Sequence, residues 1–326
     1  MVETAPALVF STLTLTGDAI SRPITLLRQE DFPACQFDAD AGKFRTRSDW
    51  QPSSSPHNHA GHLFLRLGDC IGGGRSAVVY DAEILTTSAS KEGYIPLPSE
   101  EKLCVKIARP NRCRTLAREA WVCDQLRSRG RLQGVIAPRT YGFFAVELSR
   151  QQPPTFLPWN TEDFELDLRE DDPEDDPLRD DPLPGDRLID VYDEGPGGRE
   201  LSSWCHWRPD PDAPLLAVIV MSRGGAVYTR EDDADKATQE DVRAILDDLA
   251  ASYLWHGDLR PNNLVRAPAG TELCEIHDRV HAWNIIDFAW TCVDDANGDF
   301  KTKSRSIREL QRAGFGTYYF WHGSLT

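Results

Sequence analysis

The residues best suited to chemistry lie in one polar loop, His256 to Asn263, with the sequence HGDLRPNN. Phosphoryl transfer needs a carboxylate that orients the attacking hydroxyl and accepts its proton, and it needs an oxygen ligand for Mg²⁺ nearby. Asp258 and Asn263 have the side chains for these two roles, and Arg260 can offset charge on the transferred phosphoryl group. Taken alone, the loop is equally consistent with a turn that uses Asp and Asn for backbone reasons.

A second acidic position follows a short apolar stretch, residues 283–286, that is predicted to be a buried strand. Asp287 comes directly after this stretch and is followed by Phe288 and Ala289. A carboxylate at the end of a buried strand carries a desolvation cost, which a metal ion offsets. Asp287 is therefore a candidate metal ligand together with Asn263, although a simple turn has the same residue types.

Three consecutive glycines, residues 72–74, lie between two stretches that are typical of β-strands. Without a Cβ, a glycine lets backbone N–H groups come close to anionic phosphates. By itself such a run more often marks a tight turn.

Lys106 lies near the end of the predicted strand 103–108, and Glu119 lies on the helix predicted to follow it. A lysine that points off a central strand needs a partner, and a glutamate on a helix can hold its ammonium group for contact with phosphates. A single lysine near the end of a strand is usually solvated, so this pair gains weight only from its neighbours in the sequence.

The elements that must position these residues are predicted from hydrophobic periodicity. Predicted strands cover residues 62–68, 77–84, 103–108, 141–148 and 215–221. Predicted helices cover residues 111–130, 238–253 and 304–313. Asn111 can cap the first helix and Gly130 can end it. Thr238 and Asp241 resemble a capping box at the start of the second.

The net charge of −16 is concentrated in one segment. Residues 161–194 contain sixteen acidic residues and only three arginines. Low hydrophobicity and repulsion between like charges predict that residues 149–214 are a largely disordered surface insertion. An acidic segment also repels nucleic-acid phosphates, and we expect no nucleic-acid partner.

The eight cysteines are scattered and contain no C-x-x-C pair. This pattern favours reduced thiols in a cytoplasmic or nuclear protein and argues against structural zinc. No apolar run approaches the ~20 residues that span a bilayer, and residues 1–10 lack the basic region of a secretory signal. We therefore expect no membrane partner.

The order of these features resembles the eukaryotic protein-kinase superfamily, over roughly residues 62–320. The glycine loop of that family is similar to Gly72, Gly74 and Val79 here, with Ala77 in place of its third glycine. The resemblance implies that this hairpin covers the phosphates of ATP, and that Lys106 contacts the α- and β-phosphates.

The same resemblance implies that Glu119 holds Lys106. It assigns Asp258 as the catalytic base and places the metal ligands at Asn263 and Asp287. The segment that starts at Met221 resembles the family's hinge, where backbone groups hold adenine. ATP and Mg²⁺ are thus the ligands that the resemblance implies.

Several positions depart from the family pattern. Gly257 replaces the arginine that, in the family, reads a phosphorylated activation loop. Arg260 replaces a lysine, and Ala289 replaces the glycine of D-F-G. No A-P-E sequence follows Asp287, after which 39 residues remain. The His-Gly-Asp start also resembles aminoglycoside- and choline-type kinases. The chain most nearly resembles kinase-like proteins of fungi, which share this loop, the I-I-D-F strand and an acidic insertion.

From these observations we expect an α+β, bilobal protein-kinase-like fold. Residues 1–60 would form an N-terminal extension and linker. Residues 61–221 would form a small lobe with a five-stranded antiparallel sheet and one helix, and residues 222–326 an abbreviated, mainly helical large lobe. The expected function is ATP-dependent phosphorylation of Ser/Thr hydroxyls on a protein. A small-molecule kinase and a nucleotide-binding pseudokinase or scaffold are the alternatives.

Overall fold

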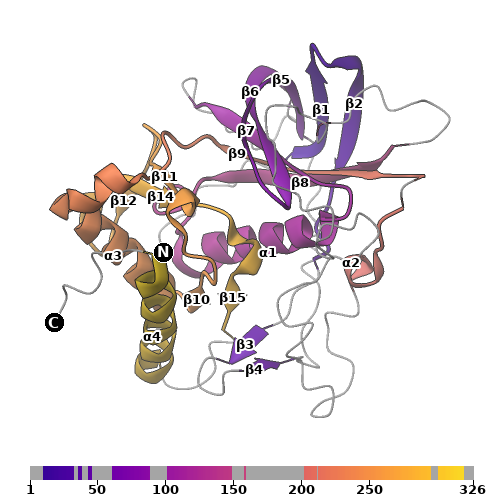
Figure 1. Cartoon of the computed structure of the whole chain (residues 1–326). Helices are drawn as coiled ribbons and strands as arrows, with labels where there is room; N and C mark the ends of the chain where they lie inside the picture. Colours follow the sequence, from indigo (N-terminus) through magenta and orange to yellow (C-terminus); the bar gives the residue numbers. More distant parts are fainter. Residues whose placement is uncertain are drawn as a thin grey trace.

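Seven strands form a closed barrel in the computed structural model, which describes residues 10–32, 36–38, 43–45, 61–88, 101–148, 158, 202–210, 212–294 and 300–318. The barrel occupies the top of the molecule in Figure 1. Its strands are β1 (Phe10–Gly17), β2 (Ile20–Arg28), β5 (Gly61–Gly73), β6 (Ala77–Ser88), β7 (Leu103–Ala108), β8 (Thr140–Glu147) and β9 (Leu215–Ser222). Around the barrel they follow the order β1-β2-β8-β9-β7-β6-β5.

The barrel differs from the expected five-stranded antiparallel sheet in two ways. The five predicted strands are present, but β1 and β2 add to them from residues that we had placed in an N-terminal extension. In addition, β1 runs parallel to β5, with Leu13 opposite Leu63 and Leu15 opposite Leu65. This parallel pair closes the sheet on itself, which local periodicity could not predict because its two strands are far apart in the sequence.

Alternation along each strand decides which side chains fill the barrel. In β5 the inward residues are Leu63 and Leu65, both fully buried. In β7 the inward residues include Val105, so Lys106 lies on the outer face. The same rule places Val79 of β6, which pairs with Lys106, on that outer face.

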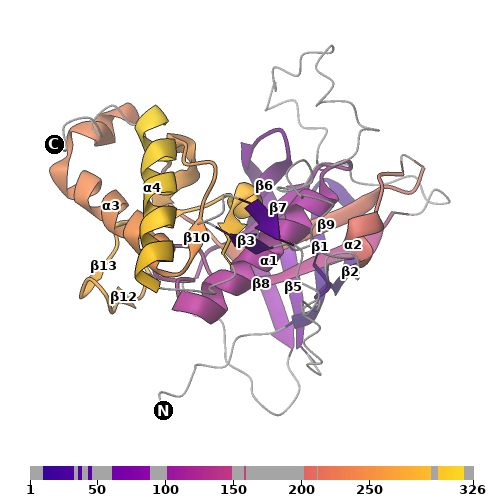
Figure 2. The same cartoon turned by 90° about the horizontal axis from the view of Figure 1, so that it is seen from below.

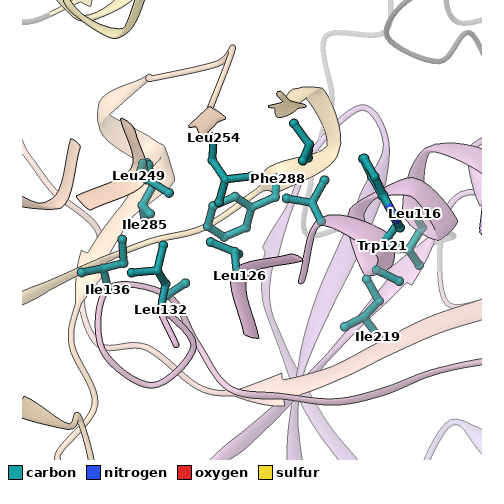
Figure 3. Close-up of a cluster of buried hydrophobic side chains, with 14 of the residues drawn as sticks. Leu116, Trp121, Leu126, Leu132, Ile136, Ile219, Leu249, Leu254, Ile285 and Phe288 are labelled. Carbon is teal, nitrogen blue, oxygen red and sulfur yellow. The ribbon is translucent and has the colours of Figure 1, made fainter. Parts of the chain in front are cut away.

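Helix α1 (Cys113–Gly130) packs along the outer face of the barrel, below it in Figure 1. Its buried side chains, such as Leu116 and Trp121, join a second hydrophobic cluster that also contains Ile219 of β9 and Phe288. Figure 3 shows this cluster running from the barrel strands to the C-terminal half of the chain. The predicted helix limits are nearly correct, but Arg112 rather than Asn111 is at the N-cap, and Gly130 is the last helical residue.

The C-terminal half contains two long helices among its described residues, α3 (Lys236–Ala251) and α4 (Phe300–Tyr318), which lie side by side (Figures 1 and 2). The cap of α3 is Asp235, whose side chain accepts from the amides of Ala237 and Thr238, so the predicted capping box at Thr238 is wrong by about one turn. Helix α4 is longer than predicted and continues through Gly314.

Short elements connect these helices. The strands are β10 (Leu254–Trp255), β11 (Leu264–Arg266), β12 (Leu273–Cys274), β13 (Arg279–Val280), β14 (Trp283–Ile285) and β15 (Cys292–Val293), with 3₁₀ turns η2 (Arg230–Ala234), η3 (Pro261–Asn263) and η4 (Phe288–Trp290). They form the antiparallel pairs β10-β15, β11-β14 and β12-β13. A further small pair, β3 (Gln36–Asp38) and β4 (Lys43–Arg45), comes from the N-terminal part.

The end of the predicted insertion is ordered. Residues Ser203–His206 form α2, and Trp204 is buried with its ring 5.3 Å from that of Phe143. A buried aromatic anchor explains this order, whereas most of residues 149–214 lie outside the described part of the chain. Among the described residues, no helix combines the length and apolar character needed to cross a membrane.

Candidate functional site

The Lys106 ammonium group is held between two carboxylates from distant parts of the chain. Its Nζ lies 2.6 Å from Glu119 Oε2 on α1 and 2.7 Å from Asp287 Oδ1, which follows β14. Glu119 is almost fully buried, whereas about 40% of the Asp287 side chain is exposed. The structure therefore brings together three of the predicted site residues, with Asp287 at the more open side.

These contacts shift the pKa values of Lys106 and Asp287. Burial lowers the pKa of Lys106, but attraction to Asp287 and Glu119 outweighs it, so the net pKa is above its usual range. The Lys106 charge is also the main reason why the pKa of Asp287 lies below its ordinary value. At neutral pH the site therefore contains a fixed ammonium group and an ionised, partly exposed carboxylate.

Asp287 itself adopts a left-handed backbone conformation, with φ 64° and ψ 67°. For a residue other than glycine this conformation costs of the order of 1–3 kcal/mol, although Asp and Asn tolerate it better than most. The turn follows β14 directly, and the side chain of Asp287 reaches Lys106 from it. A strained residue at a charged site is typical of functional positions.

In the polar loop, Asp258 is contacted by both of the other predicted residues. Arg260 Nε lies 2.7 Å from Asp258 Oδ1. The Asn263 Nδ2 group donates to the Asp258 carbonyl oxygen at 2.8 Å and to Oδ2 at 3.3 Å. Since the amide nitrogen of Asn263 is used in this way, its Oδ1 atom is the one suited to a cation.

A backbone hydrogen bond joins the loop to the strand that carries the second carboxylate. The amide of Ile286 donates to the carbonyl oxygen of Asn263 at 2.9 Å, and Leu264 pairs with Ile285 in the β11-β14 ladder. Asn263 and Asp287 are thereby placed on neighbouring strand ends. Two oxygen-bearing side chains in this arrangement fit a hard cation such as Mg²⁺.

His256 makes a second connection between the same two segments. It is fully buried, its Nε2 lies 2.9 Å from the Ile286 carbonyl oxygen, and its Nδ1 accepts from the Asp258 amide at 3.4 Å. A carbonyl can only accept, so Nε2 carries the proton. Burial lowers the pKa of His256, which keeps the ring neutral. Phe288 packs edge-on against this ring at 5.2 Å.

The glycine hairpin has the open backbone that the sequence suggested. Gly72 pairs with Val79 across β5 and β6, and the Gly74 amide donates to the Ala77 carbonyl at 2.8 Å. Among the described residues, a Cβ added at Gly74 would meet no atom within 4 Å, and one at Gly72 would meet Val79 at 4.0 Å. Packing within this part of the protein therefore does not explain these glycines, and a ligand approaching the backbone would.

Met221 lies at the end of β9, on the barrel face that also carries Lys106. It packs against the second hydrophobic cluster, and its neighbour Ser222 donates a backbone hydrogen bond to Arg139. The amide of Arg223 donates to Lys102. The predicted hinge segment is thus next to the site, with two of its amides bonded within the protein.

Gly257 shows why the sequence departs from the kinase pattern at this position. Its φ is 76°, and an added Cβ would lie 2.5 Å from the Trp290 carbonyl oxygen. A side chain such as arginine does not fit this backbone.

Sequence reasoning did not identify Arg118, although it is fully buried beside Glu119. Its guanidinium donates to the carbonyl oxygens of Ala289 at 3.1 Å and Thr291 at 2.6 Å. It therefore ties α1 to the turn that follows Asp287. The sequence does not single it out, because Arg118 is one of several charged residues in this helix.

No family model matches the chain, and no curated protein matches it. Solved structures with some likeness include the BubR1 kinase domain, at 13% identity and a TM-score of 0.35, covering 88% of this chain and 56% of that one. Another is a Stt7 homolog from Micromonas algae soaked with ATP, at 12% identity and a TM-score of 0.34, covering 76% and 53%.

The chain thus spans about half the length of these two proteins. TM-scores below 0.5 do not establish a shared fold, so we base the functional proposal on the side chains described above.

Proposed function

We propose that this chain is a kinase-like, ATP-dependent phosphotransferase that acts on a hydroxyl group. The observation that supports it best is the meeting of Lys106 with Glu119, 13 positions away, and with Asp287, 181 positions away, beside the loop of Asp258 and Asn263. Phosphoryl transfer is catalysed mainly by positioning and electrostatics, and these are the groups it requires.

In this proposal Lys106 contacts the α- and β-phosphates of ATP, and Glu119 keeps its ammonium group in place. Gly72, Gly74 and Val79 form the hairpin over the phosphates. The Met221 segment lies along the adenine. Two of the three N–H groups of Lys106 are bonded to carboxylates, so the third can donate to phosphate oxygens. The bond to Asp287 would weaken when this contact forms.

Asn263 and Asp287 would hold Mg²⁺, which supplies positive charge for the transferred phosphoryl group. Asp258 orients the acceptor hydroxyl and takes its proton, and Arg260 moves from Asp258 toward the developing negative charge. Arg260 is more than half exposed, which leaves its side chain room for this change. Asp287, partly exposed and ionised, can take a metal ion without first losing a proton.

A Ser or Thr hydroxyl of a protein is the acceptor that we propose first. A small-molecule alcohol is the second candidate, and one observation favours it. The backbone conformation at Gly257 requires glycine, so the His-Gly-Asp motif is needed for the conformation of this loop. The same motif resembles that of aminoglycoside- and choline-type kinases. Kinship with the fungal kinase-like proteins that share this motif stays a prediction.

The test is Mg²⁺-dependent transfer of labelled γ-phosphate by the full chain, with generic protein substrates and with aminoglycoside or choline as acceptors. We expect Asp258→Asn to lower the rate about 10²- to 10⁴-fold while ATP binding, measured by calorimetry, is kept. Asp18→Asn, at an exposed position distant in the fold, is the matched control.

Absence of any Mg²⁺-dependent turnover in the wild type, with ATP still bound, would leave a nucleotide-binding pseudokinase. Turnover that survives Asp258→Asn would contradict the assignment of the base.

A further inference from the structure

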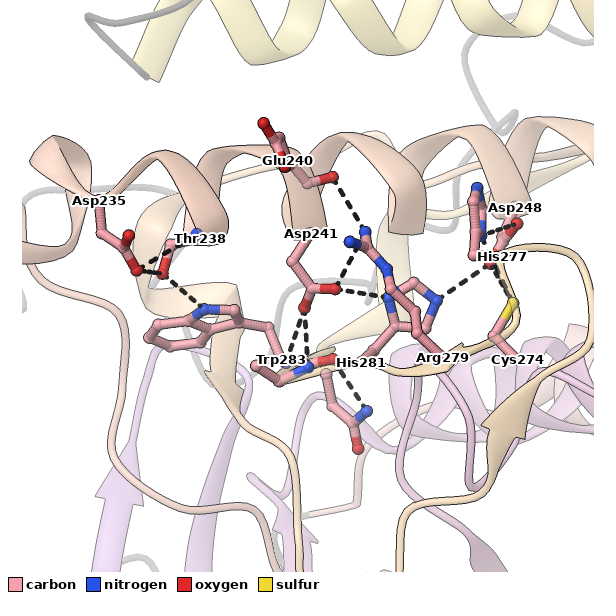
Figure 4. A network of polar contacts seen from close by, with 12 residues as sticks. Asp235, Thr238, Glu240, Asp241, Asp248, Cys274, His277, Arg279, His281 and Trp283 are labelled. Carbon is pink, nitrogen blue, oxygen red and sulfur yellow. Dashed lines mark hydrogen bonds and ion pairs between the residues drawn. The ribbon is translucent and has the colours of Figure 1, made fainter.

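Four potential metal ligands converge where α3 meets the β12-β13 hairpin (Figure 4). They are Asp248, Cys274, His277 and His281, and their ligand atoms all lie within 4.8 Å of one another. Asp248, Cys274 and His281 are buried, and His277 is partly exposed. The three hairpin residues follow one another with the spacing C-x₂-H-x₃-H.

Four separations among these groups, measured to one or the other Asp248 oxygen, fall in the range found around a small tetrahedral cation. Cys274 Sγ lies 3.3 Å from Asp248 Oδ2 and 3.5 Å from His277 Nδ1. His277 Nδ1 lies 3.4 Å from Asp248 Oδ1, and His281 Nε2 lies 3.5 Å from Asp248 Oδ2. Zinc bonds of about 2.0–2.3 Å in tetrahedral geometry give ligand separations of about 3.3–3.7 Å.

A second carboxylate orients one of the imidazoles. His281 Nδ1 lies 2.8 Å from Asp241 Oδ1, while Oδ2 of Asp241 accepts from the amides of Ala282 and Trp283. When Nδ1 donates its proton to Asp241, Nε2 presents a lone pair toward Asp248 and Cys274. A histidine that is ligated through one nitrogen and bonded to a carboxylate through the other is the usual arrangement at zinc sites.

The surroundings of His281 Nε2 give independent support for a bound metal ion. This atom is buried, and among the described residues it has an ion-pair contact with Asp248 Oδ2 at 3.5 Å but no hydrogen bond of normal geometry. A metal-free network is the competing explanation, in which His281 is an imidazolium between Asp241 and Asp248. In that case Nε2 would be expected at a normal hydrogen-bond distance of about 2.7–3.2 Å from Asp248, which is shorter than the separation found.

We propose that Asp248, Cys274, His277 and His281 bind one structural Zn²⁺ ion. One thiolate, two imidazoles and one carboxylate form a closed set of four ligands with the mixed softness that Zn²⁺ accepts. The two anionic ligands balance the charge of the ion, so a buried site carries no net charge. This proposal does not depend on the phosphotransfer activity.

The place of the site in the fold indicates what the ion would do. Asp248 lies near the end of α3, which leads into the His256 loop, and His281 lies just before β14, which leads to Asp287. The ion would link α3 to the segment that leads into β14. The expectation of no structural zinc depended on the absence of a C-x-x-C pair, whereas this site contains a single cysteine.

The test begins with the metal content of the full chain, purified and dialysed against trace zinc and then against metal-free buffer. We expect about one zinc per chain by mass spectrometry. After replacement by cobalt, we expect visible absorption of a tetrahedral ion and a near-ultraviolet thiolate-to-cobalt band. Cys274→Ser should abolish that band, and His277→Ala, at the partly exposed position, should lower the metal content at least tenfold.

The controls are Cys70→Ser and His62→Ala on the barrel, which should keep the wild-type metal content. If Cys274→Ser does not fold, the wild type alone remains informative, because a chelator should lower its melting temperature by several degrees and added zinc should restore it. Wild-type protein with less than a tenth of an ion per chain, or His277→Ala with the metal content of the controls, would overturn the proposal in favour of the metal-free network.

Discussion

The Nε2 atom of His256 lies 2.9 Å from the carbonyl oxygen of Ile286, so a neutral imidazole joins the Asp258 loop to the strand that leads to Asp287. Because Nδ1 of the same ring accepts from the Asp258 amide, the ring fixes both carboxylate-bearing segments. This requires the neutral form, since an imidazolium would have no acceptor for that amide.

The first prediction concerns pH. Burial lowers the pKa of His256, although its bond to Ile286 and the charges of Asp287 and Asp258 oppose the shift. The unfolded chain, with an ordinary histidine pKa of about 6.5, therefore takes up a proton at higher pH than the folded protein. Above about pH 6.5, His256 has no effect on the free energy of unfolding. As the pH falls below the unfolded pKa toward the lower, folded pKa, the protein loses stability.

His256→Gln, which keeps a donor near Ile286, should remove this slope. Between pH 7 and 5.5 the wild type should lose up to about 1.4 kcal/mol per pH unit more than the variant in urea unfolding. His62→Gln, at a partly exposed position, is the control and should follow the wild type. Equal slopes for wild type and His256→Gln would show that the imidazole is not held neutral.

The second prediction concerns the Lys106–Glu119 pair. Lys106→Met leaves the buried Glu119 carboxylate next to Asp287 without its cation, and we expect a loss of about 3 kcal/mol in the free energy of unfolding. The substitution Glu119→Gln should then lower the free energy of unfolding less in the Lys106→Met background than in the wild type. Urea unfolding of the four proteins forms a double-mutant cycle, and strict additivity would argue against the ion pair.

The third prediction concerns Arg118. Arg118→Met removes both hydrogen bonds to the turn after Asp287, leaving buried carbonyl groups without a donor. We expect a loss of about 2–4 kcal/mol in unfolding free energy and, if the chain transfers phosphate, a lower kcat. Arg127→Met, on the same helix in a partly exposed pair with Asp124, should change stability by less than about 1 kcal/mol. Similar losses of unfolding free energy for both variants would contradict the proposed role of Arg118 in joining α1 to the turn after Asp287.

The fourth prediction compares two glycines. Gly257→Ala meets a left-handed backbone and the Trp290 carbonyl oxygen, and it should cost more than about 2 kcal/mol. Gly74→Ala enters open space and should change the unfolding free energy by less than about 0.5 kcal/mol. If Gly74 covers phosphates as proposed, this variant should nevertheless raise the KM for ATP. An unchanged KM would place the nucleotide elsewhere.

Local sequence patterns were sufficient for much of the site. The β7 strand lies where the alternation of Leu103 and Val105 predicts it, and that alternation alone places Lys106 on the outer face. The pairing with Glu119 was implied by the resemblance to protein kinases, and the helix directly after the strand supplies that glutamate. These are short-range relationships, in which periodicity of 2 or 3.6 residues decides which face a side chain occupies.

The relationships that could not be predicted are long-range. The pairing of β1 with β5 depends on the closure of the whole sheet, and the buried Arg118 finds its partners more than 170 positions along the chain. The capping of α3 by Asp235 was missed for a different reason, because Asp235 and Thr238 have equally suitable side chains and only tertiary packing chooses between them.

The closed barrel has a consequence for association between molecules. An open five-stranded sheet would present two edges of unpaired N–H and C=O groups, which can recruit strands from other chains. Here β1 pairs on one side with β2 and on the other with β5, so the seven barrel strands have no terminal member. Cutting the chain before β5 would expose both β5 and β8 as new edges, and we would expect such a fragment to aggregate through strand addition.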